Sequence, residues 1–226
     1  MTAAPSALIF DLDGTLLDTL EDLADSGNAT LAGLGLPEHP TDAYRLFVGL
    51  GVGELVRRML PEAQRDETTL RRAGVLLIEE YKRRWKVKTR PYPGVLELLE
   101  SLRALGLPVC VLSNKPQDYT DLTLREFFPG LPFTRVRGAR LDTPNKPHPA
   151  GALTLATELG LAPGMFAFVG DSATDMKTAR GAGMLPVGVL WGFRDETELL
   201  VNGSRHLLAE PAELLALLRP APPKAD

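Results

Sequence analysis

Residues 7–19 read Ala-Leu-Ile-Phe-Asp-Leu-Asp-Gly-Thr-Leu-Leu-Asp-Thr. The first four residues are apolar, as expected for a short buried strand, and they lead directly into Asp11 and Asp13. Two carboxylates at the end of a buried strand are unusual, because an unpaired charge is costly to remove from water. In an open α/β sheet, however, ligand sites form at the carboxyl ends of the strands. We therefore predict that Asp11 and Asp13 form a catalytic, metal-binding pair.

The segment that follows has the pattern of a run of helices. Apolar residues recur at helical spacing over residues 19–34, 52–60 and 66–85, and nothing in this region resembles a buried strand. We expect Tyr81 and Trp85, on one face of the third helix, to belong to a hydrophobic core. Residues 18–89 are therefore predicted to be an all-helical insertion after the first strand.

From residue 90 onward, short apolar segments alternate with helical patterns. We expect strands at 108–112, 133–136, 165–169, 185–190 and 206–208, and helices at 95–105, 119–128, 149–159, 174–182, 196–200 and 211–218, with a frayed tail from Pro220. This alternation predicts a parallel sheet with helices on both faces. The fold class is thus α/β, with a Rossmann-like core of residues 1–17 and 90–226.

Composition and charge exclude several classes of function. The 226 residues carry a formal net charge of −4, which argues against a nucleic-acid partner because such binding needs a basic face. The sequence contains no run of about 18 apolar residues, the pattern that predicts a membrane span. The single cysteine, Cys110, cannot form an internal disulfide and is expected to be a buried thiol in a reducing compartment. With no signal-peptide pattern at the N-terminus, we expect a cytoplasmic monomer or homodimer that acts on a small molecule.

Four polar clusters are expected to meet at one edge of the sheet, because the carboxyl ends of parallel strands open on the same side. They are Asp11 with Asp13 and Thr15; Ser113-Asn114-Lys115-Pro116; Lys146 in a loop before a helix; and Gly170-Asp171-Ser172-Ala173-Thr174-Asp175. Carboxylates, hydroxyls and a lysine in one crevice suit a cation and an anionic substrate. Hard oxygen ligands favour Mg²⁺ over zinc.

Taken together, these clusters resemble the four ordered motifs of the haloacid dehalogenase superfamily, and the likeness covers nearly the whole chain. The helical insertion, residues 18–89, is similar to the cap domain of that superfamily. Residues 89–95 and 113–116 look most like those of phosphoglycolate phosphatases. Each motif alone is a weak signal, whereas all four in order, at strand ends or helix starts, form a specific one.

The resemblance implies a Mg²⁺-dependent phosphatase that works through an aspartyl-phosphate. Asp11 would attack phosphorus, and Asp13 would protonate the leaving oxygen and later activate water. The metal would be held by Asp11, by the backbone carbonyl of Asp13 and by Asp171, with Asp175 as a further ligand or a supporting residue.

The resemblance also implies how the phosphoryl group is bound. Lys146 would balance the charge of the nucleophile and the phosphoryl group, while Thr15, Ser113 and Asn114 would donate hydrogen bonds to phosphoryl oxygens. Gly170 and Ser172, like Asp175, would support the site. Asp13 favours phosphoryl transfer over halide displacement, because a halide leaving group needs no acid and the dehalogenases lack an aspartate at this place.

The substrate stays open at this stage. Phosphoglycolate is the leading candidate; a phosphosugar mutase of the β-phosphoglucomutase type, a pyrophosphatase and a nucleotidase share the same core chemistry, and a non-catalytic regulator that senses a metabolite is a further alternative. Specificity should depend on the helical insertion. There Gly49-Leu50-Gly51 is either a loop that approaches the substrate or only the start of a helix. Arg45, Arg57 and Arg58 are either partners of a substrate carboxylate or ordinary surface arginines.

Overall fold

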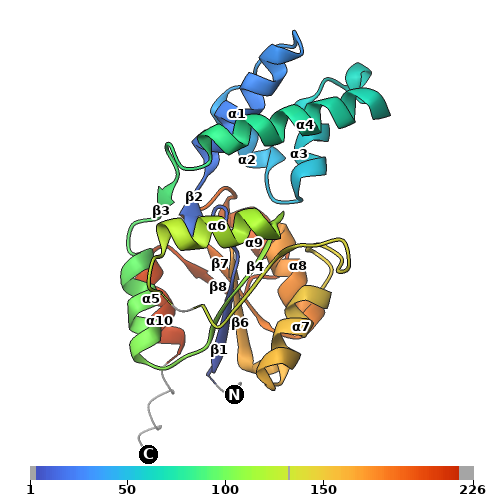
Figure 1. Cartoon of the computed structure of the whole chain (residues 1–226). Helices are drawn as coiled ribbons and strands as arrows, with labels where there is room; N and C mark the ends of the chain where they lie inside the picture. Colours follow the sequence, from blue (N-terminus) through green and yellow to red (C-terminus); the bar gives the residue numbers. More distant parts are fainter. Residues whose placement is uncertain (1–3, 132, 219–226) are drawn as a thin grey trace, which may run out of the picture.

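A six-stranded parallel sheet forms the centre of the larger part of the chain (Figure 1). The computed structural model describes residues 4–131 and 133–218. The strands run in the order β5-β4-β1-β6-β7-β8, with bounds β1 Ala7–Phe10, β4 Val109–Pro116, β5 Arg135–Ala139, β6 Phe166–Gly170, β7 Leu185–Val189 and β8 His206–Leu208. All the pairings are parallel, so the predicted parallel sheet is confirmed.

Helices cover both faces of this sheet (Figure 1). They are α5 Val95–Ala104, α6 Gln117–Phe127, α7 Ala150–Leu159, α8 Ala173–Ala182, α9 Glu196–Val201 and α10 Leu214–Leu217. Because side chains alternate along a strand, Leu8 and Phe10 of β1 belong to the apolar cluster formed with α5 and α6. Ala7 and Ile9 belong to the cluster formed with α7 and α8 on the other face. The central strand is therefore buried on both sides, as a parallel strand must be.

The inserted segment is helical, as predicted, and lies over the carboxyl ends of the strands (Figure 1). It contains α1 Leu20–Gly33, α2 Tyr44–Phe47, α3 Val52–Met59 and α4 Glu67–Arg84, with 3₁₀ turns at Thr41–Ala43 and Glu62–Gln64. Its helices share an apolar cluster of their own, which includes Tyr81 and Trp85. The chain enters the segment through β2 (Leu17–Asp18) and leaves it through β3 (Arg90–Pro91).

Several predicted bounds were wrong. Residues 113–116 are not a loop after a strand, because β4 continues through them and Pro116 pairs with Ala139 of β5 after an irregularity in register. The strand predicted at 133–136 lies at 135–139, and the predicted last helix is a 3₁₀ turn, Pro211–Glu213, followed by one helical turn. The short helix α2 and the β2–β3 pair were not predicted. The tail from Pro220 lies outside the described residues.

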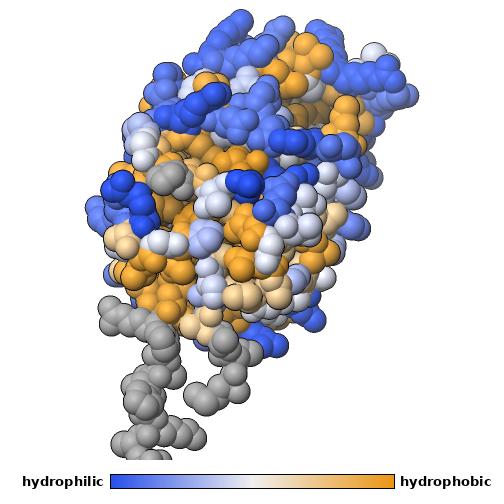
Figure 2. All heavy atoms as spheres, turned by 60° about the horizontal axis from the view of Figure 1, so that its bottom comes forward, coloured by the Kyte–Doolittle hydropathy of each residue, from blue (hydrophilic) through white to orange (hydrophobic). Residues whose placement is uncertain are grey.

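The surface differs between the two parts of the chain. Figure 2 shows hydrophilic side chains over most of the helical segment, whereas the face of the core at the base of the sheet exposes more apolar side chains. On α4, for example, Arg71 pairs with Glu67, and Arg83 with Glu80. Among the described helices, none is both long and apolar enough to cross a membrane.

A buried carboxylate fixes the exit of the helical segment to its entry. Asp22 of α1 is 1% exposed, and it accepts hydrogen bonds from the backbone amides of Lys88 (3.0 Å) and Thr89 (2.8 Å) and from the Thr89 hydroxyl (2.8 Å). A charged acceptor makes such bonds stronger than neutral ones. Asp22 therefore holds the return linker against the first helix.

We expect Asp22→Ala to lower the free energy of unfolding by about 3 kcal/mol, because buried amide donors would lose a charged acceptor. Urea denaturation would measure this change. The control is Asp25→Ala, since the Asp25 carboxylate is part-exposed and pairs with Lys88 at the surface; its loss should cost less than about 1 kcal/mol. Equal losses in the two variants would contradict the assignment.

Candidate active site

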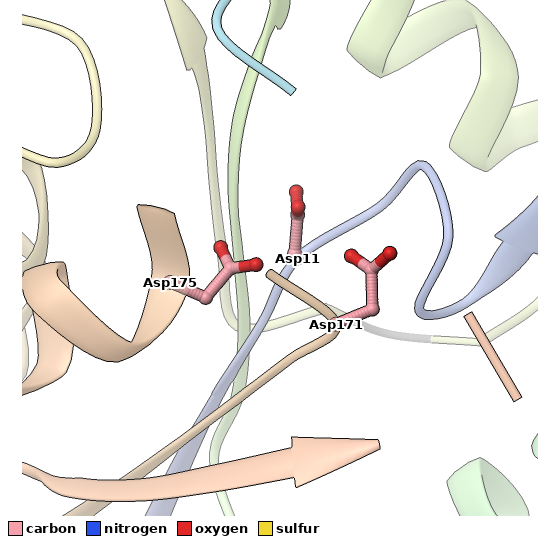
Figure 3. Close-up of side chains that lie close together, drawn as sticks. All are labelled: Asp11, Asp171 and Asp175. Atoms are coloured by element: carbon pink, nitrogen blue, oxygen red, sulfur yellow. The ribbon is translucent and has the colours of Figure 1, made fainter. Parts of the chain in front are cut away.

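Three buried carboxylates meet at the carboxyl edge of the sheet. Asp11 follows β1, Asp171 follows β6 and Asp175 lies in the first turn of α8, and Figure 3 shows their carboxylates grouped together. One oxygen from each lies within 4.8 Å of the others. The three side chains share this edge because parallel strands end on the same side, as the sequence predicted.

The Lys146 ammonium lies between two of these carboxylates. Its Nζ is 2.8 Å from Oδ1 of Asp11 and 2.7 Å from Oδ1 of Asp175. Lys146 is 4% exposed, so the ion pairs are shielded from water and each charge depends on its partners. The structure thus brings Lys146 to the predicted nucleophile.

The Asn114 side chain fixes the backbone of Lys146. Its Oδ1 accepts from the Lys146 amide and its Nδ2 donates to the Lys146 carbonyl, both at 2.9 Å. The same Nδ2 also donates to the carbonyl of Gly49 in the helical segment, at 2.9 Å. Because both amide hydrogens are engaged, the predicted phosphate contact of Asn114 would require the Gly49 loop to move away.

Asp175 is held rigidly by the start of α8. Its Oδ2 accepts from the backbone amide of Ser172 (3.1 Å) and from the Ser172 hydroxyl (2.7 Å), a reciprocal cap of the helix N-terminus. A side chain at Gly170 could not fit, because its Cβ would lie 2.3 Å from Cβ of Asp175. Because Oδ1 of Asp175 is bound to Lys146, both oxygens of this carboxylate already have partners. This arrangement suits a residue that supports the site.

Asp171 is oriented by two donors. The backbone amide of Phe193 donates to its Oδ2 at 2.7 Å, and the Thr15 hydroxyl lies 3.5 Å from its Oδ1. Gly14 has φ +89°, and a Cβ there would lie 2.4 Å from Oδ2 of Asp171, so this position requires glycine. Sequence reasoning missed the Phe193 amide, because a backbone donor leaves no signature in residue identity.

Burial raises the affinity of this cluster for positive charge. Desolvation and the Asp175 carboxylate raise the pKa of Asp171 to about 7, and desolvation raises the pKa of Asp11 well above its usual range against the opposing effect of Lys146. The acidic partners, in turn, raise the pKa of Lys146. One lysine does not neutralise three clustered carboxylates, and an all-oxygen donor set suits a hard divalent cation. The residues present therefore fit a metal ion.

Asp13 is not one of these three clustered carboxylates and lines, together with Asp11, a cleft between the core and the helical segment. Both of its oxygens accept from Lys115 Nζ, at 2.9 and 3.2 Å. The Ser113 hydroxyl lines the same cleft and accepts from the Lys115 amide at 3.1 Å. Lys115 lies in the Ser113–Pro116 motif, and its contact with Asp13 could not be predicted because the direction of its side chain depends on the course of β4.

The arginines predicted as partners of a substrate carboxylate do not line this cleft. Arg45 bonds to Asp42 and to the Gly192 carbonyl. Arg58 bonds to Glu54 and to the Leu46 carbonyl, and Arg57 is exposed. Gly49 and Gly51, in contrast, do border the cleft, and Gly51 also precedes the first residue of α3.

Comparisons with known proteins agree with this geometry. The sequence model of the haloacid dehalogenase-like hydrolases matches residues 8–189. A phosphoglycolate phosphatase of Neisseria meningitidis is 34% identical over 196 residues, covering 85% of this chain and 83% of that protein. One from Chromobacterium violaceum is 33% identical over 217 residues, covering 92% and 96%. The crystal structure of a predicted phosphoglycolate phosphatase from Haemophilus somnus superposes with a TM-score of 0.89 at 29% identity, covering 95% and 98%.

Proposed function

The chain belongs to the haloacid dehalogenase-like hydrolases, and from this premise we propose that it is a Mg²⁺-dependent phosphatase that hydrolyses phosphoglycolate through an aspartyl-phosphate. Its relatives show that the chain is a phosphatase of this family and that it acts on a small phosphorylated molecule. The observation that carries the finer proposal is the position of Lys146, bound to Asp11 in a cluster of buried carboxylates.

Asp11 is assigned as the nucleophile. Its Oδ1 accepts from Lys146 Nζ and, at 2.6 Å, from the Leu12 amide. These donors hold the carboxylate in one orientation, and Oδ2, which accepts no hydrogen bond from the described residues, is the oxygen that attacks phosphorus. The ester bond breaks as the Asp11–phosphorus bond forms, which divides one difficult displacement into two easier ones.

Asp13 is assigned as the acid and base. It lies two residues beyond the nucleophile and borders the cleft through which an ester would enter. There it would give a proton to the leaving oxygen and later take one from the water that releases phosphate from Asp11. Such help contributes a factor of roughly 10²–10⁴ in rate.

Mg²⁺ would be held by Asp11, the backbone carbonyl of Asp13 and Asp171, supported by Asp175 and Ser172. When bound, it neutralises charge on the transferring phosphoryl group. The Thr15 and Ser113 hydroxyls remain our candidates for donors to phosphoryl oxygens, and Lys146 supplies the fixed positive charge on the protein side. Preorganised charge of this kind is usually the largest single contribution to catalysis.

We propose that residues 18–89 act as the cap domain. The Arg194 guanidinium of the core donates to the carbonyls of Arg45 and Val48 in this segment, and Asn114 donates to Gly49. These contacts join backbone carbonyls of the segment to the core next to the cleft. Closing and opening of the segment would make and break them, excluding water during the reaction.

A panel of phosphorylated molecules tests the proposal. Phosphoglycolate, sugar phosphates, a nucleotide and pyrophosphate would be incubated with the purified chain, with Mg²⁺ or with a chelator, and free phosphate would be measured. We expect phosphate release from phosphoglycolate to exceed the others and to stop with the chelator. Formation of a sugar-phosphate isomer without free phosphate would indicate a mutase, and the absence of turnover on every compound would overturn the enzymatic proposal.

We expect Mg²⁺ to bind more tightly as the pH rises toward about 7. The raised pKa of Asp171, about 7 without metal, means that this carboxyl carries a proton at lower pH, and a metal ligand must first lose it. The affinity should therefore fall by at least about tenfold for each pH unit below that pKa, and the raised pKa of Asp11, the other carboxylate ligand, adds to this dependence. Isothermal titration calorimetry across this pH range measures it, and an affinity independent of pH would contradict the assignment of Asp171 as a ligand.

A further inference from the structure

Lys115 is a buried cation at the entrance to the reacting groups. It comes from β4 and is 8% exposed, and its Nζ lies 2.9 Å from Oδ1 of Asp13. The same ammonium lies over the ring of Tyr81, 4.9 Å from its centroid, where the ring face attracts positive charge. Its position is thus defined by one group of the core and one of the helical segment.

The Tyr81 hydroxyl is an unpaired polar group beside this cation. Tyr81 of α4 is 8% exposed, yet its hydroxyl has no hydrogen-bond partner in the described part of the chain. Leaving a buried hydroxyl without a partner costs about 1–3 kcal/mol. Tyr81 lines the cleft, but its hydroxyl oxygen is covered in this arrangement, so an atom of a ligand can satisfy it once the helical segment opens.

The remaining walls of the cleft are poor in charge. The helical segment contributes apolar side chains, namely Leu23, Val52, Leu55, Leu77 and Ile78. Among the described residues that line the cleft, Asp11, Asp13 and Lys115 are the charged ones. A second anionic group of a substrate would therefore meet one cation there, Lys115, and beside it the hydroxyl of Tyr81, whose ring this cation contacts.

The contact between Lys115 and Asp13 determines which part of a substrate lies near Lys115. Asp13 must contact the ester oxygen that it protonates, and Lys115 already lies within hydrogen-bond distance of Asp13. An acidic group one carbon away from that oxygen is then within reach of the ammonium. A carboxylate suits one cation and one hydroxyl, whereas a second phosphate would bring about twice the charge to a position beside Asp13.

We propose that Lys115, together with the Tyr81 hydroxyl, binds a carboxylate next to the ester oxygen of the substrate and is thereby the specificity-determining residue of the site. This inference rests on the proposed phosphatase function. The substrate carboxylate is then recognised by residues of the core strand β4 and of α4, and not by the arginines of the helical segment. A substrate with a neutral group at this position would leave the cation bound to Asp13 alone.

The test compares two esters that differ only at this position, phosphoglycolate and 2-hydroxyethyl phosphate. For the unmodified chain, kcat/KM should be higher for phosphoglycolate. In Lys115→Met, we expect the ratio of the two kcat/KM values to fall by about 10–100-fold, through a higher KM for phosphoglycolate, because a charge-assisted contact is lost. Tyr81→Phe should lower the ratio in the same direction and by less. Lys82→Met, at an exposed position of the same helix, is the matched control and should keep the ratio.

The ratio separates recognition from a structural role. If Lys115 only orients Asp13, Lys115→Met will slow both esters equally and the ratio will not change, which would overturn the inference. An unmodified chain that hydrolyses both esters equally well would overturn it too, while one that hydrolyses neither would refute the proposed function instead. If Lys115→Met does not fold, Lys115→Gln is assayed in its place, with circular dichroism as the check on folding.

Discussion

Asp11→Asn is expected to lower the rate of phosphate release by about 10⁴-fold or more, the magnitude found when a catalytic nucleophile is removed. The amide of asparagine is a poor nucleophile, so no covalent intermediate can form. The fold should be kept, because asparagine has the same size and its oxygen can still accept from the Leu12 amide and from Lys146. The substitution also removes one of three mutually repelling carboxylates, so thermal stability without metal should not fall.

Two measurements check this expectation. Steady-state assays give the rate, and mass spectrometry after an acid quench would detect a phosphorylated peptide containing residue 11 in the unmodified chain and not in the variant. Asp25→Asn, at a part-exposed carboxylate of α1, serves as the control and should leave the rate unchanged. Turnover within tenfold of normal in Asp11→Asn would rule out Asp11 as the nucleophile.

Lys146→Met is expected to reduce both activity and stability. Removing one partner of a buried ion pair typically costs about 3–5 kcal/mol, because the remaining charges stay buried without compensation. For a chain of this size such a loss lowers Tm by roughly 10 °C. Activity should fall as well, since Asp11 and the phosphoryl group would face each other without a fixed cation.

The stability of Lys146→Met should depend on pH and on Mg²⁺, which makes this prediction specific. The pKa of Asp11 and that of Asp171 are raised in the folded protein, so protonation stabilises the fold at low pH and this stabilisation is lost as the pH rises. The defect of Lys146→Met should therefore be larger at pH 8 than at about pH 6, and Mg²⁺ should restore part of it. Thermal unfolding at both pH values, with Mg²⁺ or chelator, measures this. Lys177→Met, an exposed lysine of α8, should change stability by less than about 0.5 kcal/mol.

The residues at the edge of the sheet could be predicted because topology places them. Once alternating strands and helices indicate a parallel sheet, residues that follow β1 and β6 must lie at the same edge. Asp11 and Asp171 also lie close together there, because the structure places these two strands side by side. Lys146 needed the resemblance to a family, since a lysine in a loop carries no geometric information by itself. The mutual contacts of these residues agree with the predicted site, while their catalytic roles remain to be tested.

What could not be predicted depends on side-chain direction. Ser113, Asn114 and Lys115 are consecutive, and because β4 continues through them successive side chains take opposite directions, with Asn114 bound to Lys146 and Lys115 to Asp13. Tyr81 was predicted as a core residue from helical periodicity. It does belong to that cluster, but periodicity cannot show that the same residue also lines a cleft.

The paired linkers β2 and β3 also bear on how the chain folds. β1 must pair with β4, which brings Leu8 to Val109 across the whole helical segment, and closing a long loop slows folding. The antiparallel contact of Leu17 with Pro91 joins the two ends of that segment. Because the helices form and pack locally, they bring the two ends of the segment together before β1 pairs with β4. The loop that this pairing must close is then short. The same insertion that covers the active site therefore reduces the entropic cost of assembling the sheet beneath it.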